Sequence, residues 1–261
     1  MSLWTFKENV DEFFWFGLFN LTRRFHSRFM RRASLTLLPV SSEDWCLILN
    51  GPSSAHIEPK HLDYSKIVFV NFGFRRPEFN KVEQPILVIV DVNLVNGIWP
   101  EDMLEQAISC NPNCTFVLNY KFFSYVNTLP KKVKDKVTYL ANSKIPTKYN
   151  IAKHNKAASF GFGVGVAEQS ISFCMQNGAK NIHIYGLDCN NVVLALSNKD
   201  THVYGSDEAK RWGDAKHNAR ELRFQSYMLD RLRLLKIYCD CNGICLHNYS
   251  DSLMTSFIGK K

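Results

Sequence analysis

The sequence lacks several features that would assign it to a common class of protein. None of its hydrophobic runs is long enough to span a bilayer, because the most apolar one near the start covers only residues 13–19. The chain contains no P-loop, no dinucleotide-binding glycine fingerprint and no Asp-x-Asp pair. It also has no internal repeat, low-complexity tract or RNA-binding signature. Any phosphate ligand must therefore be bound without a familiar loop or a metal-binding acidic pair.

The start of the chain is not typical of a signal peptide. Acidic residues at positions 8, 11 and 12 precede the apolar run, and no small-residue cleavage site follows it. We therefore expect a cytoplasmic protein whose eight cysteines are reduced. Cys239, Cys241 and Cys245 lie close in sequence, but their spacing fits no standard zinc pattern. We expect buried thiols there, with Cys239 in a strand-like run, and no metal or other cofactor.

The composition is that of a single globular domain. Hydrophobic residues make up 46% of the 261 residues, which excludes general disorder. Basic residues exceed acidic residues by 32 − 24 = 8. This charge favours an anionic partner, which is a phosphate-bearing ligand, a nucleic acid or an acidic membrane surface. The charge alone does not choose among the three.

Residues 1–42 differ from residues 43–261 and form an N-terminal extension of that domain. Many aromatic residues are followed there by five arginines, at positions 23, 24, 28, 31 and 32. The apolar positions follow helical spacing, which predicts an amphipathic helix. Two interpretations stay open. Residues 1–40 lie on the anionic inner face of the cell membrane, or they pack against the domain or a second copy in a homo-oligomer.

Short apolar runs alternate with helical stretches from Trp45 onward. We expect strands at 46–49, 67–70, 86–92, 115–118, 137–140, 182–185 and 237–239. Two helices are clear, at 164–176, ended by Asn177-Gly178, and at about 218–235. Because runs this apolar are typical of strands covered on both faces, the pattern predicts an α/β Rossmann-like fold. Its sheet is mostly parallel, with helices on both faces.

Polar or glycine residues follow several of the expected strands. They are Asn50-Gly51, Asn71, Asp91-Val92-Asn93 and Gly186-Leu187-Asp188. Each is ordinary turn chemistry when taken singly. In a doubly wound sheet, however, ligands bind beyond the carboxyl ends of the strands. We therefore expect these residues to form one polar crevice.

Three further segments have both a functional and a structural interpretation. Asn50 to Ser54 is a phosphate-binding loop, with Ser53 or Ser54 opening a helix, or a simple turn. Ser159 to Gly165 is rich in glycine and could cradle a phosphate, although close helix packing is the better reading. His217 precedes the second clear helix, where it is a general base or a residue without a role.

These motifs resemble the bacterial sialyltransferases of glycosyltransferase family 42. The first strand with Asn50-Gly51-Pro52-Ser53, followed by Asp63-Tyr64-Ser65, is similar to the opening of that family. Asn177 to Asp188 is similar to its helix end, strand and Gly-Ile-Asp. His217, the long helix and Lys236 to Cys239 are similar to its base histidine, helix and last core strand.

The resemblance implies a GT-A variant fold and an inverting, metal-independent sialyltransferase-like enzyme. The donor would be a CMP-activated sialic acid or related nonulosonic acid, such as Kdo, and the acceptor a cell-surface or lipid-linked glycan. Residues 190–216 would form a lid over the donor. His217 would be the catalytic base. The nucleotide contacts implied are Asn50, Gly51, Ser53, Asn71, Ser159, Gly186 and Asp188.

The chain departs from the family pattern at three places. Asn190 stands near the position of one phosphate-binding tyrosine, and only Tyr204 is placed to act as another. Lys156 stands where the family has an arginine, and Asn93 or Asp91 replaces a third asparagine. These changes bear on which sugar is recognised.

Two other functions remain as alternatives. One is a metal-dependent pyrophosphokinase or phosphotransferase on the same framework. The other is a basic module that binds RNA or membranes without catalysis. The absence of clustered carboxylates and of an RNA-binding signature counts against them, so we expect no nucleic-acid partner.

Overall fold

The structure is a computed structural model, and it describes residues 43–64, 66–119, 122–142, 160–161, 165–189, 203 and 215–250. Inside some elements, and in much of the helix from Ala215, it describes the backbone without the side chain. The extension 1–42 and the residues Lys156, Ser159, Asn190 and Tyr204 lie outside the described residues.

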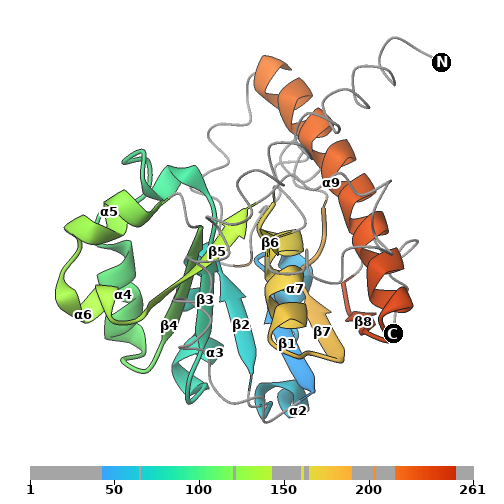
Figure 1. Cartoon of the computed structure of the whole chain (residues 1–261), viewed down its shortest axis with the longest axis horizontal. Helices are drawn as coiled ribbons and strands as arrows, with labels where there is room; N and C mark the ends of the chain where they lie inside the picture. Colours follow the sequence, from blue (N-terminus) through green and yellow to red (C-terminus); the bar gives the residue numbers. More distant parts are fainter. Residues whose placement is uncertain are drawn as a thin grey trace.

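Eight strands form one parallel sheet, in the order β6-β5-β4-β3-β2-β1-β7-β8 (Figure 1). The strands are β1 (Asp44–Ile48), β2 (Ile67–Val70), β3 (Ile86–Ile89), β4 (Thr115–Asn119), β5 (Val137–Asn142), β6 (Phe160–Gly161), β7 (Asn181–Tyr185) and β8 (Cys245–Asn248). The predicted mostly parallel α/β fold is therefore confirmed. The first six strands run outward from β1 on one side, and β7 and β8 lie on its other side.

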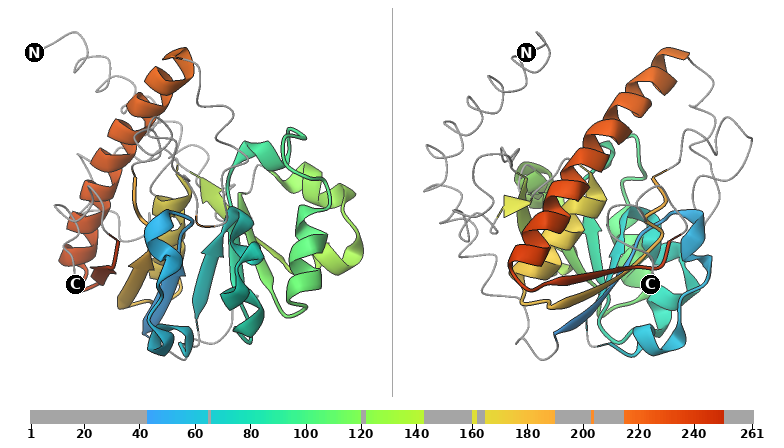
Figure 2. Two further views of the ribbon diagram at one scale, coloured as in Figure 1. Left: turned by 180° about the vertical axis from the view of Figure 1, so that it is seen from behind. Right: turned by 90° about the vertical axis from the view of Figure 1, so that its right-hand side faces the viewer.

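Helices cover both faces of the sheet, as the two views in Figure 2 show. The connections from β1 to β5 carry η1 (Pro52–Ala55), α2 (Pro59–Leu62), η2 (Asn71–Arg75), α3 (Pro77–Lys81), η3 (Val92–Leu94), α4 (Met103–Cys110), α5 (Phe123–Thr128) and α6 (Lys131–Lys134). The connections from β6 to β8 carry α7 (Val166–Gln176) and α9 (Ala215–Cys241). These two sets of helices lie on opposite faces, so the fold has three layers.

Two hydrophobic cores follow from the alternation of side chains along each strand. In β1, Trp45 and Leu47 point to the core under α7 and α9, where they meet Ile171 and Leu232. Cys46 and Ile48 point to the opposite core, which also holds Phe69, Phe79 and Met103. Because both faces of the central strands are buried, their sequences are uninterrupted apolar runs rather than alternating ones.

The chain reverses direction across the sheet at β1. Helix α7 follows β6 at one edge and crosses the face over β5, β3, β2 and β1 before β7 begins. As a result β7 pairs with β1 along its whole length, from Asp44 opposite Asn181 to Ile48 opposite Tyr185. In doubly wound folds this switch point is where a crevice opens for ligands.

The last core strand lies further along the chain than expected. Residues 237–239 belong to α9, which runs to Cys241, and the last strand is β8. Leu232, Leu235, Tyr238 and Cys239 are buried at helical spacing, and Gly243, with φ +65°, ends the helix. The apolar run was therefore one face of a helix. Helix α7 ends at Asn177-Gly178 as predicted, with Gly178 at φ +88°.

The cysteine group near the end of α9 also differs from expectation in part. Cys239 is buried against Met175, as expected for a core thiol, but in a helix, whereas Cys241 and Cys245 are exposed. Across the described residues, no set of three or more histidine, cysteine or acidic side chains is arranged to hold a metal. No helix within the described ranges combines the length and apolar character needed to cross a membrane.

Candidate functional site

The tips of β1 and β7 are joined by backbone hydrogen bonds that continue beyond the ends of the strands. The Leu49 N–H donates to the Tyr185 carbonyl oxygen at 2.8 Å, and the Gly51 N–H donates to the Gly186 oxygen at 3.2 Å. The two glycine motifs, more than a hundred residues apart in sequence, therefore meet at the switch point. The predicted convergence of Asn50-Gly51 and Gly186-Leu187-Asp188 is confirmed.

Both glycines at this junction are required by the protein's own packing. A Cβ at Gly51 would lie 2.5 Å from Asp188 Oδ2 and 2.5 Å from the Gly186 oxygen. A Cβ at Gly186 would lie 2.6 Å from the Leu49 oxygen, and φ there is +74°, a conformation that side chains disfavour. The close approach is thus between two loops of the chain, and it fixes how the loops after β1 and β7 meet at the switch point.

Asp188 connects these two loops. Its buried carboxylate accepts the Ser53 N–H at 2.9 Å through Oδ2 and the Ser53 hydroxyl through Oδ1. The Ser54 N–H donates to the Gly51 oxygen at 3.0 Å, and Pro52 has no N–H. Every backbone N–H from Gly51 to Ser54 is therefore engaged within the protein. This loop is not a ready cradle for phosphate, although each Asp188 oxygen keeps a lone pair for a ligand hydroxyl.

Two asparagines, Asn50 and Asn71, lie beside this junction on the side of β2. The side-chain Nδ2 of Asn50 donates to the Val70 carbonyl oxygen at 3.0 Å, and the backbone carbonyl oxygen of Asn50 accepts the N–H of Val203 at 2.9 Å. Asn71 adopts φ +49°, and its buried Oδ1 receives no hydrogen bond within the part of the chain that is described. A buried acceptor left in this state is suited to a ligand that donates a hydrogen bond.

Asn93 reaches the same edge of the sheet but lies further away. It follows β3, which is separated from β1 by β2, so its strand lies roughly 10 Å from β1. Its N–H donates to Asp91 Oδ1 at 2.9 Å, and its carbonyl oxygen accepts from Ile98 and Trp99. The structure shows Asn93 organising the loop after β3.

His217 lies inside the long helix rather than before it, because α9 begins at Ala215. Its side chain is not among those described. A Cβ at Gly165, the N-cap of α7, would lie 3.2 Å from Met228 Sδ, which places Met228 beside the start of α7. Since 228 − 217 = 11 residues, His217 lies roughly 16 Å further along the helix axis. The spacing that pointed to His217 also took residues 236–239 as a strand, and they are helical.

The start of α7 brings one further acidic residue, Glu168, near Cys189 and Asp188, which sequence reasoning did not find. Glu168 Oε2 occupies the space that a Cβ at Gly165 would need, 2.5 Å away. Burial, together with the smaller effect of the negative charges of Glu168 and Asp188, raises the pKa of the neighbouring Cys189 to about 12. The Cys189 thiol is thus held protonated, which excludes it as a nucleophile near neutral pH.

Arg76 is the second group that the sequence did not reveal. Its guanidinium is 4% exposed and donates to Ser54 Oγ at 2.8 Å and to the Ser54 oxygen at 2.7 Å. Its neighbour Arg75 is exposed and lies over the Phe72 ring, 4.4 Å from its centroid. Nothing in the Arg-Arg-Pro sequence indicates which of the two arginines is buried.

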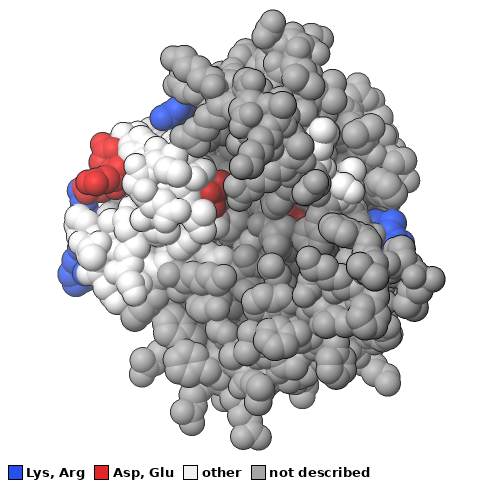
Figure 3. All heavy atoms as spheres, turned by 90° about the horizontal axis from the view of Figure 1, so that it is seen from above, with Lys and Arg blue, Asp and Glu red and all other residues white. Residues whose placement is uncertain are grey.

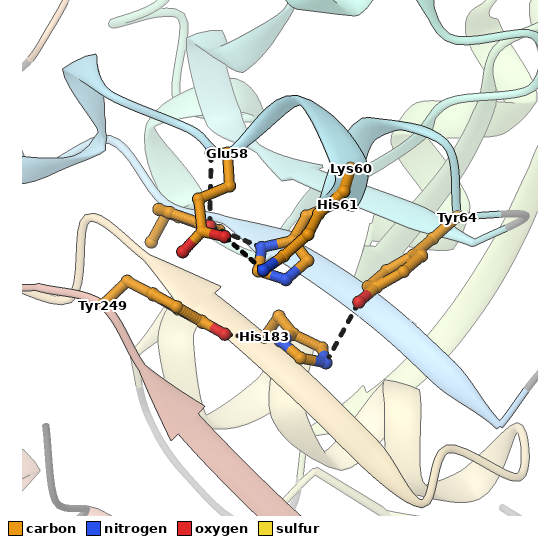
Figure 4. A network of polar contacts seen from close by, with 7 residues as sticks. Glu58, Lys60, His61, Tyr64, His183 and Tyr249 are labelled. Atoms are coloured by element: carbon orange, nitrogen blue, oxygen red, sulfur yellow. Dashed lines mark hydrogen bonds and ion pairs between the residues drawn. The ribbon is translucent and has the colours of Figure 1, made fainter. Parts of the chain in front are cut away.

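A cluster of six aromatic rings joins the β1–β2 connection to β7 and to the end of β8, and Figure 4 labels four of its members, His61, Tyr64, His183 and Tyr249. Its members are His61, Tyr64, His183, Tyr185, His247 and Tyr249. His183 bonds through its two ring nitrogens to the hydroxyls of Tyr64, at 3.4 Å, and Tyr249, at 3.0 Å. The alternation His183-x-Tyr185 in β7 and His247-x-Tyr249 at the end of β8 was its sequence signal.

The most buried histidine of the cluster, His61, contacts Tyr185. The Tyr185 hydroxyl accepts the Glu58 N–H at 3.3 Å and lies 2.5 Å from His61 Nδ1. Burial raises the pKa of Tyr185 and raises that of Tyr249 to about 12.

Charge of one sign does not gather on the described surface seen from above the strand tips (Figure 3). The part over α4 to α6 is mostly uncharged, with separate acidic and basic side chains along its rim. That part of the surface therefore offers no continuous basic patch for an extended polyanion.

Comparisons with known proteins concern the course of the chain alone. The sequence matches no protein-family model and no curated protein. The α-2,3-sialyltransferase from Campylobacter jejuni in apo form is 10% identical, with 86% of this chain and 82% of that chain covered and a TM-score of 0.47. The sialyltransferase CstII from Campylobacter jejuni, in complex with the substrate analogue CMP-3FNeuAc, is 13% identical, with coverages of 83% and 84% and a TM-score of 0.41.

Proposed function

We propose that this chain is a glycosyltransferase that takes a nonulosonic acid from a CMP-activated donor and transfers it to a glycan acceptor. The observation that carries the proposal is the contact between Ser53 and Asp188, 135 residues apart. It joins the Asn-Gly-Pro-Ser and Gly-Leu-Asp motifs, which resemble those of family 42, at the switch point of the sheet. A crevice at that point is the expected nucleotide site of such a fold.

The described groups suit a cytidine nucleotide. The Asp188 carboxylate offers acceptor lone pairs to ribose hydroxyls, as acidic residues do in related nucleotide sites. The buried Oδ1 of Asn71 is an acceptor that lacks a donor among the described residues, and the amino group of cytosine would supply one. Uracil carries a carbonyl oxygen in place of that amino group, and at the same position it would set an acceptor against the Asn71 oxygen. Asn71 would thus favour cytidine over uridine nucleotides, because pairing a buried acceptor discriminates strongly against a ligand that leaves it unpaired.

The chemistry we propose is an inverting displacement without a metal. The acceptor hydroxyl attacks the anomeric carbon as a base removes its proton, and CMP leaves. His217 is the candidate base, with Lys156 and Tyr204 as partners of the leaving phosphate. The hydrogen bond from the Val203 N–H to the Asn50 carbonyl oxygen supports a lid over this site, at 190–214 rather than at the predicted 190–216, because α9 begins at Ala215.

Nucleotide binding is the first test. In a thermal-shift titration CMP should raise the melting temperature more than UMP or AMP, because a ligand at 100 times its Kd stabilises by about 2.7 kcal/mol. Asn71→Ala should remove the preference for CMP over UMP. Equal shifts for all three nucleotides in the unaltered protein would contradict the proposed donor class.

Turnover is the second test. CMP-sialic acid and CMP-Kdo should release CMP in the presence of a glycan acceptor, with a chelator present throughout. His217→Ala should abolish transfer and keep donor binding. If the variant retains full activity, His217 is not the base and another residue has that role. Turnover of ATP with magnesium, and none of the CMP-sugars, would instead identify a phosphotransferase.

A further inference from the structure

Arg76 contacts the loop after β1, and neither the sequence motifs nor the proposed reaction gives it a role. It lies between η2 and α3, where its N–H donates to the Gly73 oxygen at 3.1 Å and its oxygen accepts from Phe79 at 3.1 Å. Pro77, the first residue of α3, fixes the backbone on its other side. The main chain of Arg76 is therefore held firmly, and its side chain points inward beneath the loop after β1.

A guanidinium buried in this way is costly unless its donors are matched. Here Nη1 and Nη2 donate to two acceptors on one residue, Ser54 Oγ and the Ser54 carbonyl oxygen. Nε lies 3.3 Å from Glu78 Oε2, which supplies the countercharge from a partly exposed position. The planar fork of arginine fits this pair of acceptors, and a lysine ammonium does not.

Ser54 passes this constraint to the rest of the loop. Its hydroxyl donates to the Gly51 oxygen at 2.7 Å, while its N–H donates to the same oxygen at 3.0 Å. Gly51 is in turn bonded to Gly186. The segment Gly51 to Ser54 is thus held from the β2 side by Arg76 and from the β7 side by Asp188.

We propose that Arg76 is a positioning residue, which holds the loop after β1 in the shape that binds the nucleotide without touching the nucleotide itself. This role rests on the proposed function for its ligand, but the restraint on the loop does not. The positive charge also acts locally, since Arg76 lowers the pKa of the Cys46 thiol against the larger, raising effect of burial.

The loop is tested first without any ligand. Amide hydrogen exchange is measured on peptides that cover residues 49–56 in the full chain, in Arg76→Lys, in Ser54→Ala and in Lys81→Gln. Lys81 is exposed at the end of α3 and provides the control for changing a basic residue near Arg76 that is not bonded to the loop. Exchange in the loop should be at least about tenfold faster in Arg76→Lys and in Ser54→Ala, and unchanged in the control.

Ligand affinity is tested next, by calorimetric titration with CMP well below the melting temperature of each variant. Arg76→Lys keeps the charge but loses the fork, so CMP should bind at least about tenfold more weakly. Ser54→Ala should weaken binding in the same direction, and Lys81→Gln should not. Combining Arg76→Lys with Ser53→Ala should cost less than the two changes added together, because both release the same loop.

The outcomes separate the two proposals. Unchanged exchange in both loop variants would overturn the restraint by Arg76. Faster exchange with unaltered CMP affinity would overturn its role in binding. If the unaltered protein binds no CMP, the proposed function fails, and the exchange measurement still decides whether Arg76 holds the loop. Ser54→Ala keeps the test valid if Arg76→Lys does not fold.

Discussion

An alanine at position 186 would place its methyl group 2.6 Å from the Leu49 oxygen and 2.9 Å from Ser54 Cβ. It would also have to adopt φ +74°. The left-handed conformation costs an alanine about 1–2 kcal/mol. Overlap in a packed site costs about 1–3 kcal/mol more. Gly186→Ala should therefore lower the free energy of unfolding by roughly 2–5 kcal/mol.

Two further glycines separate these contributions. Gly243 has φ +65° and would have no atom within 4 Å of a new Cβ, so Gly243→Ala carries the conformational cost alone. Gly51 has φ −62°, and its new Cβ would lie 2.5 Å from Asp188 Oδ2, so Gly51→Ala carries the overlap alone. The sum of the two effects should approximate the effect of Gly186→Ala.

Thermal unfolding followed by circular dichroism measures all three variants. A domain of this size loses about 2–4 °C of melting temperature per kcal/mol, so Gly186→Ala should melt roughly 10 °C lower. Gly243→Ala should lose only about 2–8 °C. If Gly186→Ala and Gly243→Ala melt at the same temperature, the loops after β1 and β7 do not meet as described.

Two other predictions follow from burial and charge. The exposed thiols of Cys110, Cys241 and Cys245 should react with a disulfide reagent at pH 8, whereas Cys46, Cys174 and Cys239, whose pKa values burial raises, should react only on unfolding; rapid labelling of Cys46 in the native protein would contradict the core. Burial raises the pKa of the Tyr249 hydroxyl to about 12. The contribution of the protonated hydroxyl to the free energy of unfolding is therefore complete below about pH 10 and is lost as the pH rises toward 12. Urea unfolding at pH 8 and pH 11 should show this loss, and Tyr249→Phe should reduce it.

The sequence located the core strands but misread the last one. Six of the seven expected strands coincide with β1 to β5 and β7, because a strand buried on both faces is a short, continuous apolar run. Residues 237–239 form an equally apolar run, yet they continue the spacing of Leu232 and Leu235 in α9. A run of three residues is too short to separate the two periods. β8 was missed because its four residues alternate between buried and more exposed positions and so form no continuous apolar run.

The candidate site was predicted as a set of residues but not as a geometry. Asn50, Gly51, Ser53, Gly186 and Asp188 meet as expected. Their bonds, however, are mostly to one another, which assigns the glycines to packing and Asp188 to holding Ser53. Which of two adjacent arginines is buried depends on the angle at which α3 leaves η2, and no local pattern encodes it.

The sequence by itself determined six of the strands and that their polar ends share one edge, because the strands of a parallel sheet all point the same way. Only the tertiary structure decided which strands are neighbours. Helix α7 carries the chain back across the sheet and sets β7 beside β1, and this long-range pairing brings Asp188 to Ser53. Contacts between residues so far apart depend on the packing of whole layers, and local periodicity holds no record of that packing.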